Sequence, residues 1–229
     1  MTFPHRPAWL ASLLLGLALV LAAPASPAWQ ARPDPAPATT ASTPEVPALV
    51  NDLEQRTFQF FWDSADPANG LVPDHYPGES FSSIAAVGFG LTAYGVGVER
   101  GYITREQAVE RTLATLRFFD TAPQGDSEDD DSGYHGFFYH FLDMKSGRRF
   151  ARWTEVSTVD TSLLLGGVLF AQSYYDRDTP AEQEIRTLAD RIYRRVDWPW
   201  AQVRAPLISM GWTPGGQFIP HDWEGYNEA

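Results

Sequence analysis

The chain has 229 residues, 44% of them hydrophobic and 14% aromatic, and it contains no cysteine. This composition is typical of a globular protein with a sizeable core, and it excludes an intrinsically disordered chain and a fold held by disulfides. The formal net charge of −12 argues against nucleic acid and anionic membranes as partners. A neutral polymer such as a glucan is not disfavoured by that charge.

Residues 1–28 are predicted to be a signal peptide. One positive charge, Arg6, precedes the apolar stretch AWLASLLLGLALVLAA, and small residues then follow at spacings that suit signal peptidase. The stretch is short for a membrane span, and a retained N-terminal anchor is the alternative. We therefore expect a bacterial periplasmic or secreted protein. Loss of Arg6 with the signal peptide would change the net charge from −12 to −13.

Residues 29–47 are rich in Pro, Ala, Thr and Ser, which predicts a flexible linker, and the domain is expected to span residues 48–229. Hydrophobic periodicity and end signals predict five helices and the start of a sixth. The five lie at residues 48–63, 82–99, 104–120, 157–176 and 179–196.

The predicted helices alternate in character. Segments 82–99 and 157–176 are rich in Gly, Ala, Leu, Ser and Thr, which is typical of helices buried on most sides. Segments 104–120 and 179–196 are amphipathic and charged, with a threonine at the N-cap and Gln107 or Glu182 at the capping-box position. This alternation favours a helical toroid built from α-hairpins over a plain helical bundle, in which every helix would carry a similar apolar stripe.

Two segments between the helices have the pattern of β-hairpins. In residues 133–153 aromatic and polar side chains alternate around the turn MKSG, and residues 207–219 form a second candidate. Such hairpins at one end of a toroid would wall a pocket.

Paired carboxylates are the only recognisable catalytic equipment, since the sequence lacks metal-ligand spacings, nucleophile elbows and nucleotide fingerprints. We therefore expect no metal and no cofactor. Asp160 stands in STVD at the start of a buried helix, where Ser157 and Asp160 also fit an ordinary capping box. A helix N-terminus would keep a carboxylate ionised, as a base or an acceptor for sugar hydroxyls requires. Glu155 is placed to flank the same pocket.

Glu228 is the second candidate acid. It lies in GYNE, at a predicted helix start, close in sequence to Trp212, Trp223 and Tyr226. Burial among aromatic rings would raise the pKa of this carboxyl and keep it protonated, as a general acid requires. The helix N-terminus would have the opposite effect, and a simple first-turn acid is the alternative.

From about residue 50 to the last residue, the chain resembles the bacterial glucoamylase-like domain family. The motifs that carry the resemblance are, in order, RTFQFFWD, GLVPD, SIAAVGFGLTAYGVGVERGYITREQA, TLRFF, GFFYHFLDMKSGRR, EVSTVDTSLLLGGVL, IYRRVDWPW and WEGYNEA. The family implies an (α/α)6 toroid of about twelve helices. It includes inverting endo-β-1,2-glucanases and domains of cyclic β-1,2-glucan synthases. Because the chain supplies five helices and a beginning, we expect it to be the N-terminal half of such a domain.

The resemblance implies that Glu228 and Asp160 match essential carboxylates. In the characterised glucanases another acid precedes the second carboxylate by three residues, whereas this chain has Ser157 there. Either Glu155 takes that role or the substrate differs from β-1,2-glucan.

These patterns together indicate an exported glycoside hydrolase acting on a β-glucan, with β-1,2-glucan favoured. A non-catalytic periplasmic glucan-binding protein, or an inactive fragment, is the alternative. Beside the three acids, the residues predicted to contact the glucan are Trp153, Trp212, Trp223, Tyr226, Asp74 and Asn227.

Overall fold

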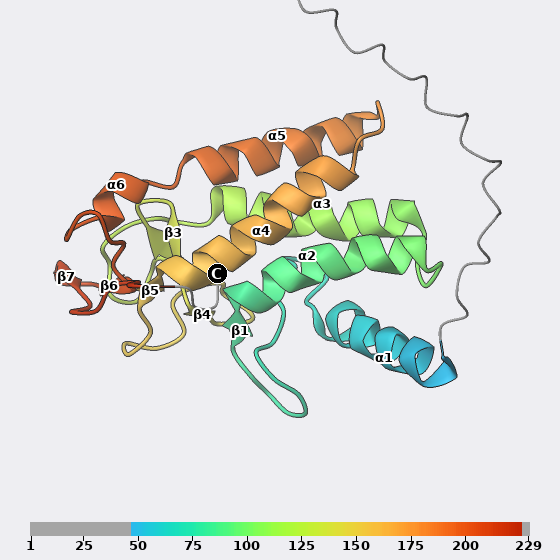
Figure 1. Ribbon diagram of the computed structural model, residues 1–229, viewed down its shortest axis with the longest axis horizontal. Coiled ribbons are helices and arrows are strands. Elements are labelled where there is room, and N and C mark those ends of the chain that lie inside the picture. Colours follow the sequence, from blue (N-terminus) through green and yellow to red (C-terminus); the bar gives the residue numbers. More distant parts are fainter. Residues whose placement is uncertain (1–46, 226–229) are drawn as a thin grey trace, which may run out of the picture. The chain divides into compact units, whose positions relative to one another are not determined.

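The computed structural model describes residues 47–225, which form six helices and seven short strands (Figure 1). The helices are α1 (Ala48–Ser64), α2 (Ile84–Glu99), α3 (Arg105–Thr121), α4 (Thr158–Tyr174), α5 (Pro180–Arg194) and α6 (Trp198–Ala201). The strands are β1 (Ser82–Ser83), β2 (Gly133–Tyr134), β3 (Phe137–Tyr139), β4 (Phe141–Leu142), β5 (Val156–Ser157), β6 (Gly211–Thr213) and β7 (Gln217–Phe218). The mainly α fold and the five predicted helices are confirmed. None of the helices in this range is long and apolar enough to cross a membrane.

Helices α2 and α4 pack side by side at very short range (Figure 1). Glycines make this approach possible, because a Cβ added at Gly167 would lie 2.1 Å from the carbonyl oxygen of Gly88. A Cβ added at Gly88 would lie 2.3 Å from the carbonyl oxygen of Leu163. Close helix packing therefore explains Gly88 of α2 and Gly167 of α4.

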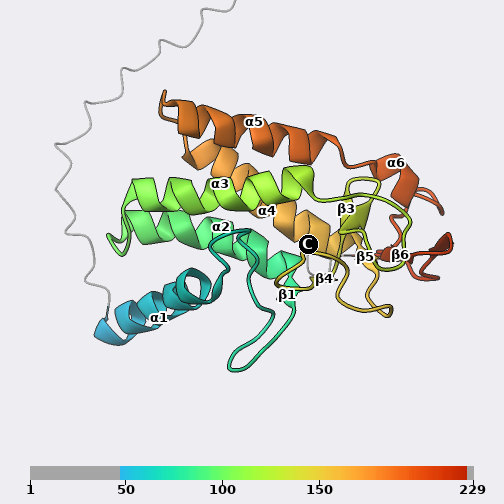
Figure 2. The same cartoon turned by 180° about the vertical axis from the view of Figure 1, so that it is seen from behind.

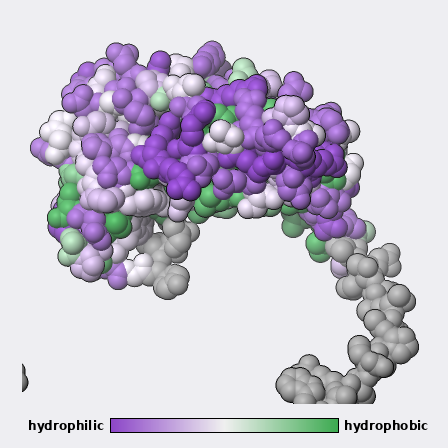
Figure 3. Space-filling model, turned by 90° about the horizontal axis from the view of Figure 1, so that it is seen from above, coloured by the Kyte–Doolittle hydropathy of each residue, from purple (hydrophilic) through white to green (hydrophobic). Residues whose placement is uncertain are grey.

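Helices α3 and α5 pack against each other and cover the buried pair. α3 lies behind α2 and α4 in Figure 1 and in front of them in Figure 2. The apolar stripe of α5 is confirmed, since Ile185, Leu188 and Ile192 are buried. Its opposite face is charged, and hydrophilic side chains dominate the view from above, where α5 comes to the front (Figure 3). The division into buried and water-facing helices is that of a two-layer α-hairpin arrangement, and its closure into a complete toroid stays a prediction.

The capping boxes predicted at α3 and α5 differ in the structure. At α3 the box is complete, because Thr104 and Gln107 bond each other's backbone N–H groups. At α5 the Thr179 hydroxyl accepts from the N–H of Glu182, but the Glu182 carboxylate accepts two hydrogen bonds from Arg105 of α3, each 2.8 Å long. The prediction of a reciprocal box at α5 is therefore wrong, since a bidentate arginine is the stronger partner for a buried carboxylate.

The strands form two small antiparallel sheets, of order β2-β3-β5-β6-β7 and β1-β4. The predicted hairpin over residues 133–153 is confirmed around the MKSG turn, where Leu142 and Arg149 form an antiparallel bridge. In that turn the Gly147 N–H is bonded to the Asp143 carbonyl, and residues 133–139 form a second, tight hairpin, the β2–β3 pair. The strand β4 pairs with β1 because it follows β3 on the far side of a bend at His140. The second predicted hairpin, β6–β7, is confirmed.

Both buried helices begin directly at the end of a strand. Ser83 ends β1 and caps α2, and Ser157 ends β5 and caps α4, each through its hydroxyl oxygen. The N-termini of α2 and α4 consequently lie at the ends of strands of the two sheets. The short helix α6 was not predicted, although Asp197 as N-cap and Pro199 within its first turn are ordinary helix-start signals.

Gly166 and Gly167 offer a matched test of the α2–α4 contact. Gly167→Ala should destabilise the protein by about 1–3 kcal/mol, because its methyl group would overlap the backbone of α2. Gly166→Ala meets nothing within 4 Å and should instead stabilise α4 by up to about 1 kcal/mol through helix propensity. The free energy of unfolding from urea titrations checks both, and equal effects of the two substitutions would contradict the packing explanation.

Glu182 and Glu184 offer a second matched pair, since both join α5 to an arginine of α3. The Glu182 side chain is 3% exposed, whereas that of Glu184 is 41% exposed. Glu182→Ala should cost about 3–5 kcal/mol because it leaves the Arg105 charge without its buried partner. Glu184→Ala should cost at most about 1 kcal/mol, as expected for an exposed ion pair with Arg117. The same unfolding experiment measures both.

Candidate active site

Two of the predicted acids converge on one histidine. The Nδ1 atom of His140 lies 3.0 Å from Glu155 Oε1, and its Nε2 atom lies 3.4 Å from Asp160 Oδ1. Glu155 comes from the residue before β5, and Asp160 from the first turn of α4. A protonated imidazole has two N–H groups to donate, so one ring serves both carboxylates.

The backbone around His140 holds this ring in place. The backbone N–H of His140 donates to the carbonyl of Glu155 at 2.9 Å. The backbone carbonyl of His140 accepts from the N–H of Ile84, the first residue of α2, at 3.2 Å. The ring also stacks on Phe141, with the ring centroids 3.8 Å apart. His140 therefore joins the start of α2 to the acids around the start of α4.

Asp160 has both of the roles that the sequence left open. Its N–H donates to Ser157 Oγ at 3.2 Å, and the Ser157 hydroxyl lies 2.5 Å from Asp160 Oδ2. This is the expected capping interaction, and it buries the carboxylate. The other oxygen, Oδ1, is the one that faces His140, so the cap orients the acid toward the site.

The charges around His140 alter its acidity. Burial lowers the pKa of the imidazole, but the hydrogen bond with Glu155 and the negative charges of Asp160, Glu155 and Asp74 outweigh burial, and the pKa is raised above the usual 6.5. Asp74, predicted to contact substrate, thus lies close enough to act on the site, and its carboxylate is 3.1 Å from His75 Nδ1. An imidazolium at His140 offsets the repulsion between the two carboxylates that face it.

The predicted aromatic residues differ in position. Trp153 is 61% exposed and lies near Phe81 and Phe141, so its ring is open to a ligand. Trp223 is partly buried, and its indole N–H donates to Thr158 Oγ1, at the start of α4, at 3.0 Å. Trp212 is only 3% exposed and stacks on Tyr134, with the ring centroids 4.6 Å apart. Its place in the core contradicts a role as an open sugar platform, because its faces are already covered.

Three predicted residues, Tyr226, Asn227 and Glu228, lie outside the described residues. The role of Glu228 as proton donor stays a prediction. Across residues 47–225, no group of three or more His, Asp and Glu side chains is arranged to hold a metal ion.

His140 was missed by the sequence analysis. No local pattern marks it, because its two partners lie 15 and 20 positions later in the chain. The pairing of β3 with β5 places His140 beside Glu155, and that pairing was not predicted.

The charge state of His140 should make stability depend on pH. Because the folded-state pKa of His140 is raised, its charged form adds to the free energy of unfolding. This contribution is fully present below the unfolded-state pKa of 6.5 and is lost as pH rises through the folded-state pKa. The loss of unfolding free energy caused by His140→Gln should therefore be largest near about pH 6 and shrink at higher pH. Urea unfolding of both proteins at several pH values measures this, and a pH-independent difference would contradict it.

Comparison with known proteins shows similarity to β-1,2-glucan hydrolases. No family model matches the chain. An exo β-1,2-glucooligosaccharide sophorohydrolase (non-reducing end) from Parabacteroides distasonis is 30% identical over 189 residues, which are 79% of this chain and 25% of the relative. This chain thus spans about a quarter of that relative's length.

Solved structures give the same relationship. A β-1,2-glucanase from Parabacteroides distasonis has a TM-score of 0.70 at 31% identity, over 79% of this chain and 26% of that chain. An endo-β-1,2-glucanase from Chitinophaga pinensis, in complex with sophorotriose and glucose, has a TM-score of 0.62 at 27% identity, over 72% of this chain and 40% of that chain. The fold and the sequence agree with the resemblance found in the motifs, and the chain belongs to the glucoamylase-like family that includes endo-β-1,2-glucanases.

Proposed function

We propose that the protein containing this chain is a glycoside hydrolase that cleaves β-1,2-glucan by inverting acid–base catalysis. The observation that carries the proposal is the convergence of Glu155 and Asp160 on His140, beside the exposed ring of Trp153. Paired carboxylates are the usual equipment for hydrolysing a glycosidic bond. The similarity to β-1,2-glucan hydrolases supports the choice of substrate.

In this proposal each acid has a separate role in catalysis. Asp160, assisted by Glu155, orients the attacking water or a hydroxyl of the sugar, for which an ionised carboxylate is needed. His140 is a positioning residue that holds both acids aimed at one point. Glu228 protonates the glycosidic oxygen of the leaving group, as its match to the family motif suggests.

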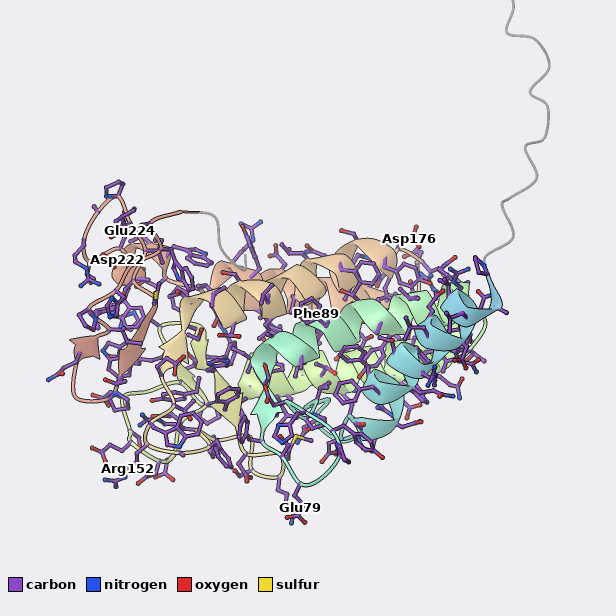
Figure 4. All side chains as sticks on the ribbon, turned by 60° about the horizontal axis from the view of Figure 1, so that its bottom comes forward. Glu79, Phe89, Arg152, Asp176, Asp222 and Glu224 are labelled. Carbon is purple, nitrogen blue, oxygen red and sulfur yellow. The ribbon has the colours of Figure 1, made fainter. Side chains whose placement is uncertain are left out.

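We also propose that further helices complete an (α/α)6 toroid. Phe89 and Val96 of α2 are exposed hydrophobic side chains, and Figure 4 shows Phe89 on the open side of this helix. An apolar helix face of this kind is normally covered in the folded protein. The chain would then be the N-terminal half of the domain, exported through the signal peptide predicted at residues 1–28.

Substitution of the acids tests the activity. In the protein expressed from its full open reading frame, Glu155→Gln, Asp160→Asn and Glu228→Gln should each lower kcat on β-1,2-glucan by about 100-fold or more, as expected for loss of acid–base groups. Asp197→Asn is a matched control. This aspartate also pairs with a histidine, His135, at 3.0 Å, and asparagine preserves its N-cap role at α6. The control should keep activity within about twofold.

The measurement is the release of reducing sugar from β-1,2-glucan and from glucans of other linkages. Full turnover by Glu228→Gln would refute the assignment of the proton donor. Binding of β-1,2-glucan by the wild-type protein without any release of sugar would refute hydrolysis and favour the non-catalytic glucan-binding alternative. Cleavage of another linkage only would refute the substrate.

A further inference from the structure

A cavity with aromatic walls lies outside the carboxylate site, in a part of the structure that the proposed chemistry does not use. Its volume is about 830 Å³, and it lies between the end of α1, the loop formed by residues 74–81, and the turn at residues 143–145. This volume is within the range of about 300–1,000 Å³ typical of small-ligand pockets. The aromatic side chains that line it are His75, Tyr76, Phe81 and Phe150.

A continuous series of ring contacts joins this cavity to the carboxylates. His140, which bridges the two acids, stacks on Phe141 at 3.8 Å. The ring centroids of Phe141 and Phe81 are 4.3 Å apart, and those of Phe81 and Phe150 are 4.6 Å apart. Trp153 lies 5.6 Å from Phe141 and 6.2 Å from Phe150. We refer to Phe81, Phe141, Phe150 and Trp153 as the aromatic track.

The track has faces that the core does not cover. Trp153 is 61% exposed and Phe150 is 41% exposed, whereas large aromatic side chains in a folded protein are mostly buried. Tyr76, on the loop of residues 74–81, is 75% exposed. Exposed aromatic surface gathered in one place, next to a catalytic site, indicates a ligand-binding surface.

The loop that carries Tyr76 is held in a defined shape. Its ends are joined by a 2.8 Å hydrogen bond from the Asp74 N–H to the Phe81 carbonyl. Inside the loop His75 Nδ1 lies 3.1 Å from the Asp74 carboxylate and 3.2 Å from the Ser80 hydroxyl. The cavity wall therefore exists before a ligand arrives, which lowers the entropic cost of binding.

The polar groups at the cavity suit a neutral, hydroxyl-rich ligand. Asp63 and Glu79 line it, and neither side chain has a hydrogen bond or ion pair with another residue in the described range 47–225. Figure 4 shows Glu79 at the tip of the loop, on the same side of the molecule as Arg152. Free carboxylates accept hydrogen bonds from sugar hydroxyls. Lys145 also lines the cavity and can donate hydrogen bonds to hydroxyl oxygens, so the lining offers both donors and acceptors to a hydroxyl-rich ligand.

We propose that this cavity and the aromatic track form a remote glucan-binding subsite. The subsite binds glucosyl units of a glucan molecule whose scissile bond lies at Glu155 and Asp160. The apolar faces of the sugar rings lie on Trp153, Phe150 and Tyr76, and the hydroxyl groups bond to the free carboxylates. This inference rests on the proposed function and adds a second binding region that favours long substrates.

The test compares long and short ligands. The protein from the full open reading frame carries Asp160→Asn to prevent cleavage, and calorimetry measures the Kd of the β-1,2-linked glucose disaccharide and of a longer β-1,2-linked oligosaccharide. The double substitution Tyr76→Ala and Phe150→Ala should weaken the longer ligand by about tenfold and the disaccharide by less than about twofold. Tyr193→Ala is the matched control, because Tyr193 is an exposed aromatic residue of α5 outside the cavity.

The outcomes separate the two proposals. If the longer ligand binds the double variant as tightly as the parent, the subsite is refuted, while loss of cleavage in Asp160→Asn still supports the proposed function. If neither ligand binds the parent and wild-type protein cleaves no glucan, both proposals are refuted. The melting temperature of each variant is measured alongside. Tyr76 is 75% exposed and Phe150 41% exposed, so neither substitution removes a buried core side chain. If the melting temperature is unchanged, weaker binding reports on contact with the ligand.

Discussion

The contact between α2 and α4 is the constraint on which the rest of the described structure depends. Backbone meets backbone at Gly88 and Gly167, where any side chain would collide. Each helix starts at the end of a strand, so the close contact also brings β1 and β5 to the same end of the helix pair. The sheets formed there, with β4 beside β1 and β3 beside β5, set the backbone of His140 between the two helix starts.

The local charges of the site follow from that position. A carboxylate near a helix N-terminus is stabilised by the backbone N–H groups, and Asp160 has this environment together with the Ser157 hydroxyl. Two negative charges in one place repel each other, and His140 reduces this repulsion by lying between Glu155 and Asp160. The same charges raise the pKa of the histidine and so favour its imidazolium form. An arrangement of this kind is well suited to holding a base or an acceptor for sugar hydroxyls in a fixed direction.

Local patterns in the sequence predicted much of the fold. Helix positions, the caps at Thr104, Thr179 and Ser157, and the division into buried and amphipathic helices all depend on neighbours within about one helical turn. Such information is present in a short window. The partner of Glu182 was predicted wrongly because Arg105 lies far away in the chain and reaches this residue only when α3 and α5 pack together. The pairing of β4 with β1 and of β3 with β5 was not predicted for the same reason, since alternation reveals a strand but does not identify its partner.

The sequence by itself determined the helical class of the domain, the family, and the carboxylates Asp160 and Glu155 as candidates, because residue type and spacing along the chain carry those properties. Only the tertiary structure decided which groups meet. It buried Trp212 in the core, left Trp153 exposed, and brought His140 between two acids that lie 15 and 20 positions later. It also assembled Phe81, Phe141 and Phe150 from separate segments into one track. Contacts of this kind depend on strand register and helix packing, which are settled by the summed interactions of the whole domain.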